Sequence, residues 1–212
     1  MGASARSGLA VLVSGAGTNL RAVLDAASAP DYPAQVVAVA SNRPGCPALE
    51  MARQAAVPAR AFPVRAGTAS TEDRDREMAG WLLQQGTTLV ALAGYDRILR
   101  SPMLEAFPGR ILNLHNSLLP AFSGTMDAVA QALEHGVKVT GCTVHLVDER
   151  FVDGGPIVLQ AAVPVLAGDT QATLLERIHR EEWRLLPEAI ALLAAGRLRI
   201  QGRQVLVSEP CR

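Results

Sequence analysis

A short apolar run near the middle of the chain, ILNLH at residues 111–115, carries two polar side chains two residues apart. If this run is a strand, Asn113 and His115 point to one face of it and Leu112 and Leu114 to the other. Asn113 could then donate to a developing oxyanion, and His115 could transfer a proton near neutral pH. The alternative is that both side chains only satisfy loop backbone. A third functional group is needed to decide between these interpretations.

Asp153 is a candidate for that third group. It lies in the turn FVDGGP at residues 151–156, whose paired glycines would let the backbone approach a ligand or the strand that holds His115. A carboxylate beside an imidazole favours the imidazolium and raises the histidine pKa. Taken alone, the Asp-Gly-Gly-Pro sequence predicts only a turn.

A glycine-rich turn, SGAGTNL at residues 14–20, joins the first predicted strand to the first predicted helix. Gly17, Thr18 and Asn19 stand where bare backbone and a helix N-terminus receive a phosphate. A dinucleotide fold would have a third glycine in place of Leu20 and an acidic residue after the second strand, and both are missing. The Gly-Lys-Ser/Thr of a nucleoside-triphosphate loop is missing too, so a phosphomonoester is the favoured ligand. A tight turn capped by Thr18 or Asn19 is the alternative.

Glu182 interrupts an apolar stripe on the last predicted helix. The other members of the stripe recur at helical spacing: Leu174, Ile178, Leu185 and Ala189. A carboxylate in such a position needs a partner. That partner is either one of the nearby arginines, in an internal ion pair, or a hydroxyl or amine of a ligand.

The histidines do not predict a metal site. No two of the four are separated by four residues, and none lies beside a carboxylate at a recognised ligand spacing. His135, just before Gly136, is expected at a helix C-terminus. His145 and His179 are expected to be structural. We therefore predict no bound metal.

Short β-rich runs alternate with amphipathic segments along the chain. The predicted strands are residues 9–14, 35–41, 89–94, 111–115 and 143–148, and the predicted helices are residues 19–27, 47–55, 72–85 and 127–135. This alternation predicts an α/β fold with a doubly wound, mostly parallel, Rossmann-like sheet and helices on both faces. Residues 157–165 predict an antiparallel C-terminal portion, and a last helix over 171–195 should bend or restart at Pro187. Ligands bind at the carboxyl ends of the strands in such sheets, where the polar pair lies.

The composition predicts one globular domain. Of the 212 residues, 49% are apolar and 19% charged, and 20 basic side chains balance 20 acidic ones. Zero net charge argues against a nucleic-acid or membrane-surface partner, and no apolar run approaches the ~20 residues that cross a bilayer. Cys46, Cys142 and Cys211 are too scattered for disulfides or a zinc site, which favours the cytoplasm. We predict a single domain over residues 1–212, with a core at about 9–195 and a hairpin at 196–207.

Seven segments together resemble the phosphoribosylglycinamide formyltransferase family, folate-dependent enzymes of purine synthesis. They are SGAGTNL (14–20), VVAVASN (36–42), LAGYDRIL (92–99), ILNLHNSLLPAFSG (111–124), TGCTVHLVD (140–148), DGGPIVLQ (153–160) and VPVLAGDT (163–170). The resemblance runs from about residue 9 to residue 207. Other 10-formyltetrahydrofolate enzymes share the fourth segment but carry an additional domain, for which this length leaves no room.

The resemblance implies transfer of a formyl group from 10-formyltetrahydrofolate, the co-substrate, to the amine of glycinamide ribonucleotide through a tetrahedral intermediate. By match to the family's motifs, Asn113 would bind the formyl oxygen and His115 would be the proton donor. Asp153 would raise the pKa of His115 and help to position water.

The resemblance also assigns binding residues. Gly17, Thr18 and Asn19 match the loop that takes the substrate phosphate, and Glu182 matches the glutamate that holds the ribose. The folate would be held by Asp96, Arg97, Ile98, Leu99 and Asn113. The expected partners are these two small molecules, with neither nucleic acid nor membrane, and a homodimer is left open.

Several residues depart from the family's pattern. Asp96 replaces the usual methionine, Thr71 stands where some members have an arginine, and Asn116 replaces the proline after the histidine. Residues 126–128 lack a histidine that often precedes the next helix, and residues 148–152 contain one extra residue. These departures affect the expected folate affinity more than the expected chemistry.

Two other functions stay open at this stage. One is a related enzyme: a formyl-folate hydrolase, or a formyltransferase acting on another amine. The other is an idle folate- or phosphate-binding protein, which the retention of Asn113, His115 and Asp153 argues against.

Overall fold

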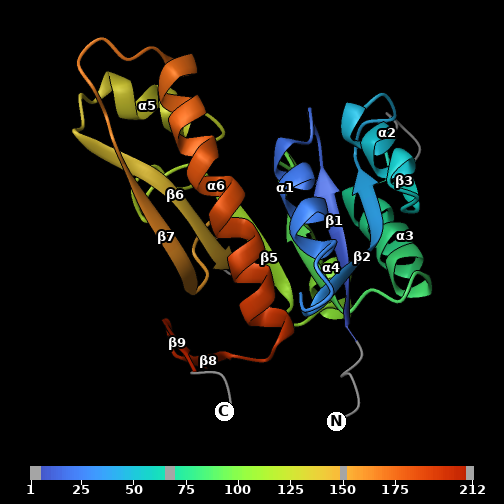
Figure 1. Cartoon of the computed structure of the whole chain (residues 1–212). Helices are drawn as coiled ribbons and strands as arrows, with labels where there is room; N and C mark the ends of the chain where they lie inside the picture. Colours follow the sequence, from blue (N-terminus) through green and yellow to red (C-terminus); the bar gives the residue numbers. More distant parts are fainter. Residues whose placement is uncertain (1–5, 65–69, 149–151, 209–212) are drawn as a thin grey trace.

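The computed structural model describes residues 6–64, 70–148 and 152–208, and a seven-stranded sheet forms its centre (Figure 1). The strands are β1 Ser7–Val13, β2 Ala34–Ser41, β3 Ala59–Ala61, β4 Leu89–Leu92, β5 Ile111–His115, β6 Val139–Leu146 and β7 Ile157–Pro164. Their order in the sheet is β3-β2-β1-β4-β5-β6-β7. The first five strands are parallel, whereas β6 is antiparallel to both β5 and β7. The predicted mostly parallel sheet with an antiparallel C-terminal portion is confirmed.

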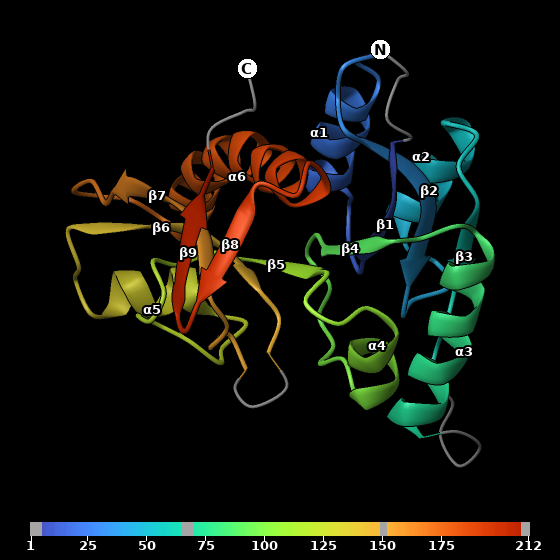
Figure 2. The same ribbon diagram turned by 90° about the horizontal axis from the view of Figure 1, so that it is seen from below.

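Helices lie on both faces of this sheet, as Figure 2 shows for α1 and α6 on one side and α3 and α4 on the other. The helices are α1 Thr18–Ala27, α2 Pro47–Gln54, α3 Thr71–Gln84, α4 Ser101–Ala106, α5 Ala128–Glu134 and α6 Gln171–Ala194. Alternate residues of β1 enter two separate cores. Leu9 and Val11 pack with buried residues of α1 and α6, whereas Ala10 and Leu12 pack with those of α3 and α4. With both faces covered, a ligand reaches the sheet at the ends of its strands.

The strand order creates a place for a crevice at the carboxyl ends of the strands. The chain leaves β1 for β2 on one side and later returns to β4 on the other, so the connections diverge between β1 and β4. A crevice forms at the carboxyl ends of strands at such a point. Farther along, the register of β5 and β6 places Asn113 opposite His145 and His115 opposite Thr143. Polar side chains of two neighbouring strands are thereby set side by side.

Some predicted elements differ from the structure. β6 begins at Val139, whereas the sequence predicted a start at residue 143. The strand is buried from Thr140 to Leu146, so no alternation of polar and apolar residues marks its start in the sequence. β3 and α4 were not predicted, since elements of three and six residues are too short to show a period. The hairpin is confirmed, with β8 Leu198–Gln201 paired to β9 Gln204–Val207.

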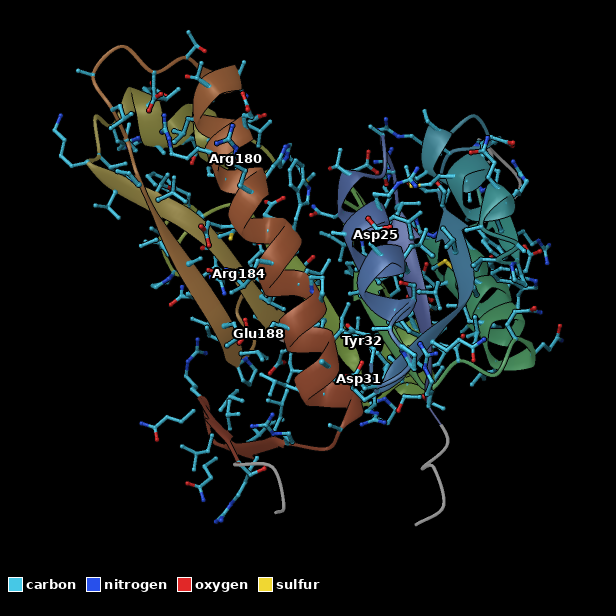
Figure 3. All side chains as sticks on the ribbon, in the orientation of Figure 1. Asp25, Asp31, Tyr32, Arg180, Arg184 and Glu188 are labelled. Atoms are coloured by element: carbon cyan, nitrogen blue, oxygen red, sulfur yellow. The ribbon has the colours of Figure 1, made fainter. Side chains whose placement is uncertain are left out.

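Pro187 does not make the last helix restart, contrary to that part of the prediction. α6 runs unbroken from Gln171 to Ala194 with Pro187 inside it. An internal proline costs about 3 kcal/mol, whereas each buried large side chain contributes about 1.5–3 kcal/mol. Leu186 and Ile190 are fully buried beside Pro187, and Tyr32 donates to the Pro187 carbonyl at 2.7 Å. Figure 3 shows Tyr32 close to the C-terminal half of α6. Packing on both sides of the proline therefore outweighs its cost.

Cys46 and Cys142 are buried and free, and Cys211 lies outside the described residues. No helix in the described part of the chain is long and apolar enough to cross a membrane.

Candidate functional site

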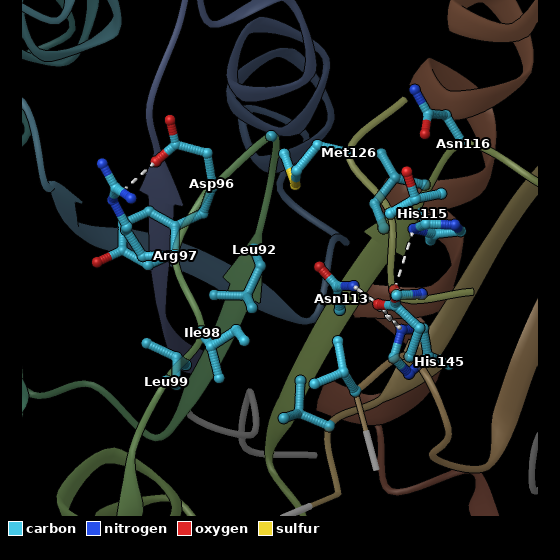
Figure 4. Close-up of a pocket in the computed structure, with 18 of the residues that line it drawn as sticks. Leu92, Asp96, Arg97, Ile98, Leu99, Asn113, His115, Asn116, Met126 and His145 are labelled. Carbon is cyan, nitrogen blue, oxygen red and sulfur yellow. Dashed lines mark hydrogen bonds and ion pairs between the residues drawn. The ribbon is translucent and has the colours of Figure 1, made fainter. Parts of the chain in front are cut away.

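A cleft of about 430 Å³ opens at the carboxyl ends of β4 and β5. Figure 4 shows its two walls, with residues 96–99 on one side and Asn113, His115 and His145 on the other. Most of the predicted site residues line it: Asn19, Asp96, Arg97, Ile98, Leu99, Asn113, His115, Asp153 and Glu182. Gly17 and Thr18 are not among its described lining residues. The fold thus brings together side chains that are far apart in the sequence.

The Asp153 carboxylate joins the polar side chains of β5 and β6. Its Oδ2 accepts the Gly124 N–H at 2.9 Å and lies 3.5 Å from His115 Nδ1. Its Oδ1 accepts from Asn113 Nδ2 at 3.2 Å and lies 3.6 Å from His145 Nε2. The third functional group that the sequence required therefore stands between the two residues of the original pair.

His115 directs both ring nitrogens at acceptors. Its Nε2 lies 3.0 Å from the carbonyl oxygen of Phe122, and its Nδ1 faces the Asp153 carboxylate. Phe122 has a φ of 55°, and this left-handed conformation belongs to the turn that presents its carbonyl to the ring. A neutral imidazole carries one N–H, whereas an imidazolium donates at both nitrogens. An acceptor is therefore in place at each nitrogen of the His115 ring.

Asp153 is held in its ionised form. Burial raises its pKa, but the His145 side chain, the Gly124 N–H and His115 together outweigh burial and leave the pKa below the usual carboxyl value. The turn that carries Asp153 lies tightly against β6, because a Cβ on Gly155 would stand 1.8 Å from the Leu146 carbonyl oxygen. Gly155 thus allows the turn to approach β6, the neighbour of the strand β5 that holds His115.

His145, predicted to be structural, belongs to the same cluster. Its Nδ1 donates to the Leu146 carbonyl at 2.9 Å, and its Nε2 lies 3.1 Å from Asn113 Nδ2. The only signal in the sequence that could have found His145 is its position opposite Asn113. That position depends on the register of an antiparallel pair, which the sequence does not give.

Glu182 is buried, and its Oε2 accepts from Asn19 Nδ2 at 2.9 Å. His179 Nε2 lies 3.9 Å from the same oxygen, and within the described residues no arginine is paired with Glu182. Burial raises the pKa of Glu182, and Asn19 and His179 only partly offset it. Asn19 Oδ1 is also buried and has no partner among the described residues. His179, predicted to be structural, lines the cleft beside this pair.

The turn before α1 presents an uncapped helix end. Gly17 has a φ of 86°, and a Cβ there would stand 2.7 Å from Ala48 Cβ, so the turn requires glycine. Neither Thr18 nor Asn19 caps α1 with its side chain, whereas α3 and α6 both begin with capping boxes. The first N–H groups of α1 therefore have no side-chain cap, and the positive end of the helix dipole is open.

Asp96 is tied to the ends of β1 and β2. Its Oδ1 accepts from Ser14 Oγ at 3.1 Å and from Asn42 Nδ2 at 2.9 Å. Its Oδ2 pairs with Arg43 Nη2, and Arg97 Nε lies 3.6 Å from its Oδ1. Two exposed arginines thus face one carboxylate, and the charge of Asp96 is balanced within the protein.

The remaining departures fall in different places. Asn116 and Met126 line the cleft, whereas Thr71 begins α3 and does not belong to the described lining residues. Of the segment with the extra residue, 149–151 lie outside the described residues. In the described ranges, no three His, Cys, Asp or Glu side chains are grouped so as to hold a metal ion.

Comparisons with known proteins show which family the chain resembles. The formyl transferase family matches residues 8–190. Phosphoribosylglycinamide formyltransferase of Mycobacterium tuberculosis is 48% identical over 211 residues, which cover 96% of this chain and 95% of that protein. The crystal structure of glycinamide ribonucleotide transformylase 1 from Symbiobacterium toebii is 52% identical, with a TM-score of 0.92 over 96% of this chain and 95% of that one.

A longer relative matches as well. The trifunctional purine biosynthetic protein adenosine-3 of Gallus gallus is 43% identical over 91% of this chain, which spans 19% of the length of that protein. The matches to the shorter enzymes extend over nearly their whole length. The chain therefore belongs to the formyl transferase family, among the phosphoribosylglycinamide formyltransferases.

Proposed function

We propose that this protein transfers the formyl group of 10-formyltetrahydrofolate to the amine of 5-phosphoribosylglycinamide, a step of purine biosynthesis. The observation that carries the proposal is the convergence of Asn113 and His115 on the Asp153 carboxylate inside the cleft. Membership of the family supports the same reaction. We place the enzyme in the cytoplasm, acting through one domain over residues 1–212 without a metal.

His115 is the proposed proton donor. When an amine attacks a formyl carbon, the nitrogen that leaves must gain a proton, and a positioned imidazolium supplies one. The ionised Asp153 balances the charge of that ring at 3.5 Å, and the Phe122 carbonyl fixes the orientation of the ring. The proton lost by the attacking amine goes to solvent, from which His115 is reprotonated.

Asn113 is the proposed donor to the formyl oxygen, where negative charge develops. Both protons of its amide are directed within the cluster, one to Asp153 and one to His145. One of them must therefore turn to the formyl oxygen when the co-substrate binds. A donor of this kind contributes about 10²–10³-fold to kcat.

The ribonucleotide is assigned to the end of the cleft beside α1 and α6. The uncapped N-terminus of α1 at Gly17, Thr18 and Asn19 suits a phosphomonoester. Asn19 Oδ1 and the Glu182 carboxylate are buried acceptors beside each other, and Asn19 Oδ1 lacks a donor in the described structure. Ribose hydroxyls supply such donors.

The folate is assigned to the wall at residues 96–99. Ile98 and Leu99 give this wall an apolar surface, and Leu104 and Val147 continue it into the cleft. A cleft of about 430 Å³ with apolar walls and a few polar groups is typical of a small-molecule site. When bound there, the folate supplies the formyl group on its N10 nitrogen.

The test mixes purified protein with 10-formyltetrahydrofolate, with and without glycinamide ribonucleotide, and follows tetrahydrofolate and formylated ribonucleotide. Turnover that requires the ribonucleotide and yields both products supports the proposal. Turnover without it indicates a hydrolase. Binding of both ligands without turnover indicates an idle binding protein. The His115→Ala variant is the control for contaminating activity.

A further inference from the structure

A buried ion pair lies outside the catalytic cluster. Arg74 and Asp75 are neighbours near the start of α3, and their side chains are 1% and 0% exposed. Arg74 Nε donates to Asp75 Oδ1 at 2.7 Å. Two charges removed from water cost more than their attraction usually returns, so a buried pair is weak support for stability. The pair requires another explanation.

The pair contacts the backbone of residues 98–100, part of the cleft wall to which we assign the folate. Arg74 Nη2 donates to the Ile98 carbonyl at 3.3 Å, and Asp75 Oδ2 accepts the Arg100 N–H at 2.6 Å. These two bonds lie on either side of Leu99. Residues 95–100 form neither helix nor strand, so no ladder fixes their backbone. The side chains of α3 take over that task.

Tyr95 is a further buried polar residue of this wall. It lines the cleft, is 7% exposed, and its hydroxyl has no partner in the described part of the chain. Arg74 Nη1 is likewise buried and unpartnered there. Arg74 and Asp75 bond to the backbone of residues 98 and 100, and Tyr95, Ile98 and Leu99 all line the cleft. The cleft wall and the ion pair therefore form one connected layer.

We propose that Arg74 and Asp75 are positioning residues, which hold residues 98–100 in the shape that binds the formyl-folate. The inference rests on the proposed function, because it takes this wall as the folate side of the cleft. This role can be distinguished by experiment from a purely structural role. A structural pair changes the melting temperature, whereas a positioning pair changes folate affinity and leaves ribonucleotide affinity alone.

The test uses paired substitutions, so that no variant buries an unmatched charge. Arg74→Met with Asp75→Ala removes both bonds to the segment. Arg74→Met with Asp75→Asn retains an acceptor for the Arg100 N–H. Arg177→Met with Asp169→Asn neutralises a remote pair between α6 and the turn before it, and is the matched control. Each protein is titrated with tetrahydrofolate by calorimetry and assayed for both KM values, and its Tm is recorded.

We expect the first variant to raise the tetrahydrofolate Kd and the formyl-folate KM about ten-fold, the loss of one or two buried hydrogen bonds. The second variant should recover part of this, to about three-fold, and the control should stay within about two-fold. The ribonucleotide KM should stay unchanged in all of them.

Unchanged folate binding in the first variant, or an equal rise in both KM values, overturns the inference. If that variant does not fold, the second variant provides the test, because an unchanged tetrahydrofolate Kd in it also overturns the inference. A wild-type protein that neither binds folate nor turns over removes the proposed function itself. A wild-type protein that does both, with unaltered variants, removes only this inference.

Discussion

The two walls of the cleft are built in different ways. One consists of neighbouring strands, so that Asn113 and His115 on β5 and His145 on β6 are fixed by register and meet at Asp153. The other is the irregular segment 95–100, held by side chains of distant elements. Group transfer needs reacting groups placed within about 0.5 Å, which regular elements achieve better than loops. We call the first the strand wall and the second the segment wall. Substitutions in the strand wall should therefore act on kcat, and those in the segment wall should act on KM.

His115→Ala should break the strand wall most severely. The variant lacks the proposed proton donor, and we expect kcat to fall by about 10²–10⁴-fold with both KM values within about three-fold of wild type. Steady-state kinetics in both substrates measure this, with circular dichroism as the control for folding. A comparable rise in KM with kcat retained would mean that the strand wall binds rather than reacts.

Asp153→Asn should have the next largest effect. An amide keeps the shape of the side chain but cannot balance an imidazolium, so we expect kcat to fall about 10²-fold and both KM values to change little. The low pKa of the wild-type carboxyl keeps it ionised throughout the neutral range. Without that charge, nothing balances the imidazolium that the proposed proton transfer requires, and the basic limb of the kcat profile should move to lower pH.

A near-native kcat with an unchanged pH profile would mean that Asp153 is not the functional partner of His115. Asp148, which also lines the cleft, would then be the next carboxylate to replace. In His115→Ala the basic limb should be absent, which separates the two roles.

The strand wall could be predicted from the sequence in part. The alternation of the run at 111–115 gave the common face of Asn113 and His115, because a strand has a fixed period of two. His145 was missed, since its place depends on which residue of β6 lies opposite Asn113. Local pattern gives the face of a side chain, but not its partner on another strand.

The segment wall was predictable only through the family resemblance. Nothing in the local sequence shows that Ile98 and Arg100 bond to Arg74 and Asp75, or that Asp96 bonds to Asn42. These contacts join segments far apart in the sequence. The apolar stripe of the last helix did predict the burial of Glu182, because helical spacing is a local property.

Glu182 tests whether regularity alone decides the role of a residue. It lies on a long helix, yet we assign it to binding, so Glu182→Gln should raise the ribonucleotide KM about ten-fold and leave kcat and the folate KM nearly unchanged. A loss of kcat instead would show that regular elements carry only chemistry here.

The same variant should alter stability with a defined sign. The raised pKa of Glu182 means that the folded protein holds this proton more tightly than the unfolded chain. The stabilisation that comes from this bound proton is complete below the pKa of Glu182 in the unfolded chain. It is lost as the pH rises through the pKa in the folded protein. Glutamine carries no charge, so Glu182→Gln should melt about 2–4 °C higher than wild type at pH 7.5 and equally at pH 4. Scanning calorimetry at the two pH values measures this.

Asp96→Asn should give the smallest effect and refine the picture of the segment wall. In the wild-type protein one carboxylate faces the exposed Arg43 and Arg97, so neither arginine is fully available to a second anion. Lengthening the glutamate tail of the folate should consequently improve its KM only slightly. Asparagine keeps an oxygen for Ser14 and Asn42 but releases both arginines.

We therefore expect Asp96→Asn to lower the KM of a triglutamate co-substrate by up to about three-fold, the range of exposed ion pairs, with the monoglutamate KM unchanged. Exposed charges are screened within about 10 Å at 0.1 M salt and about 3 Å at 1 M, so the difference should disappear at high salt. Kinetics with both tail lengths at the two salt concentrations are the measurement. An equal change for both tails would show that Asp96 shapes the segment wall, as Arg74 and Asp75 do, rather than controlling charge at its edge.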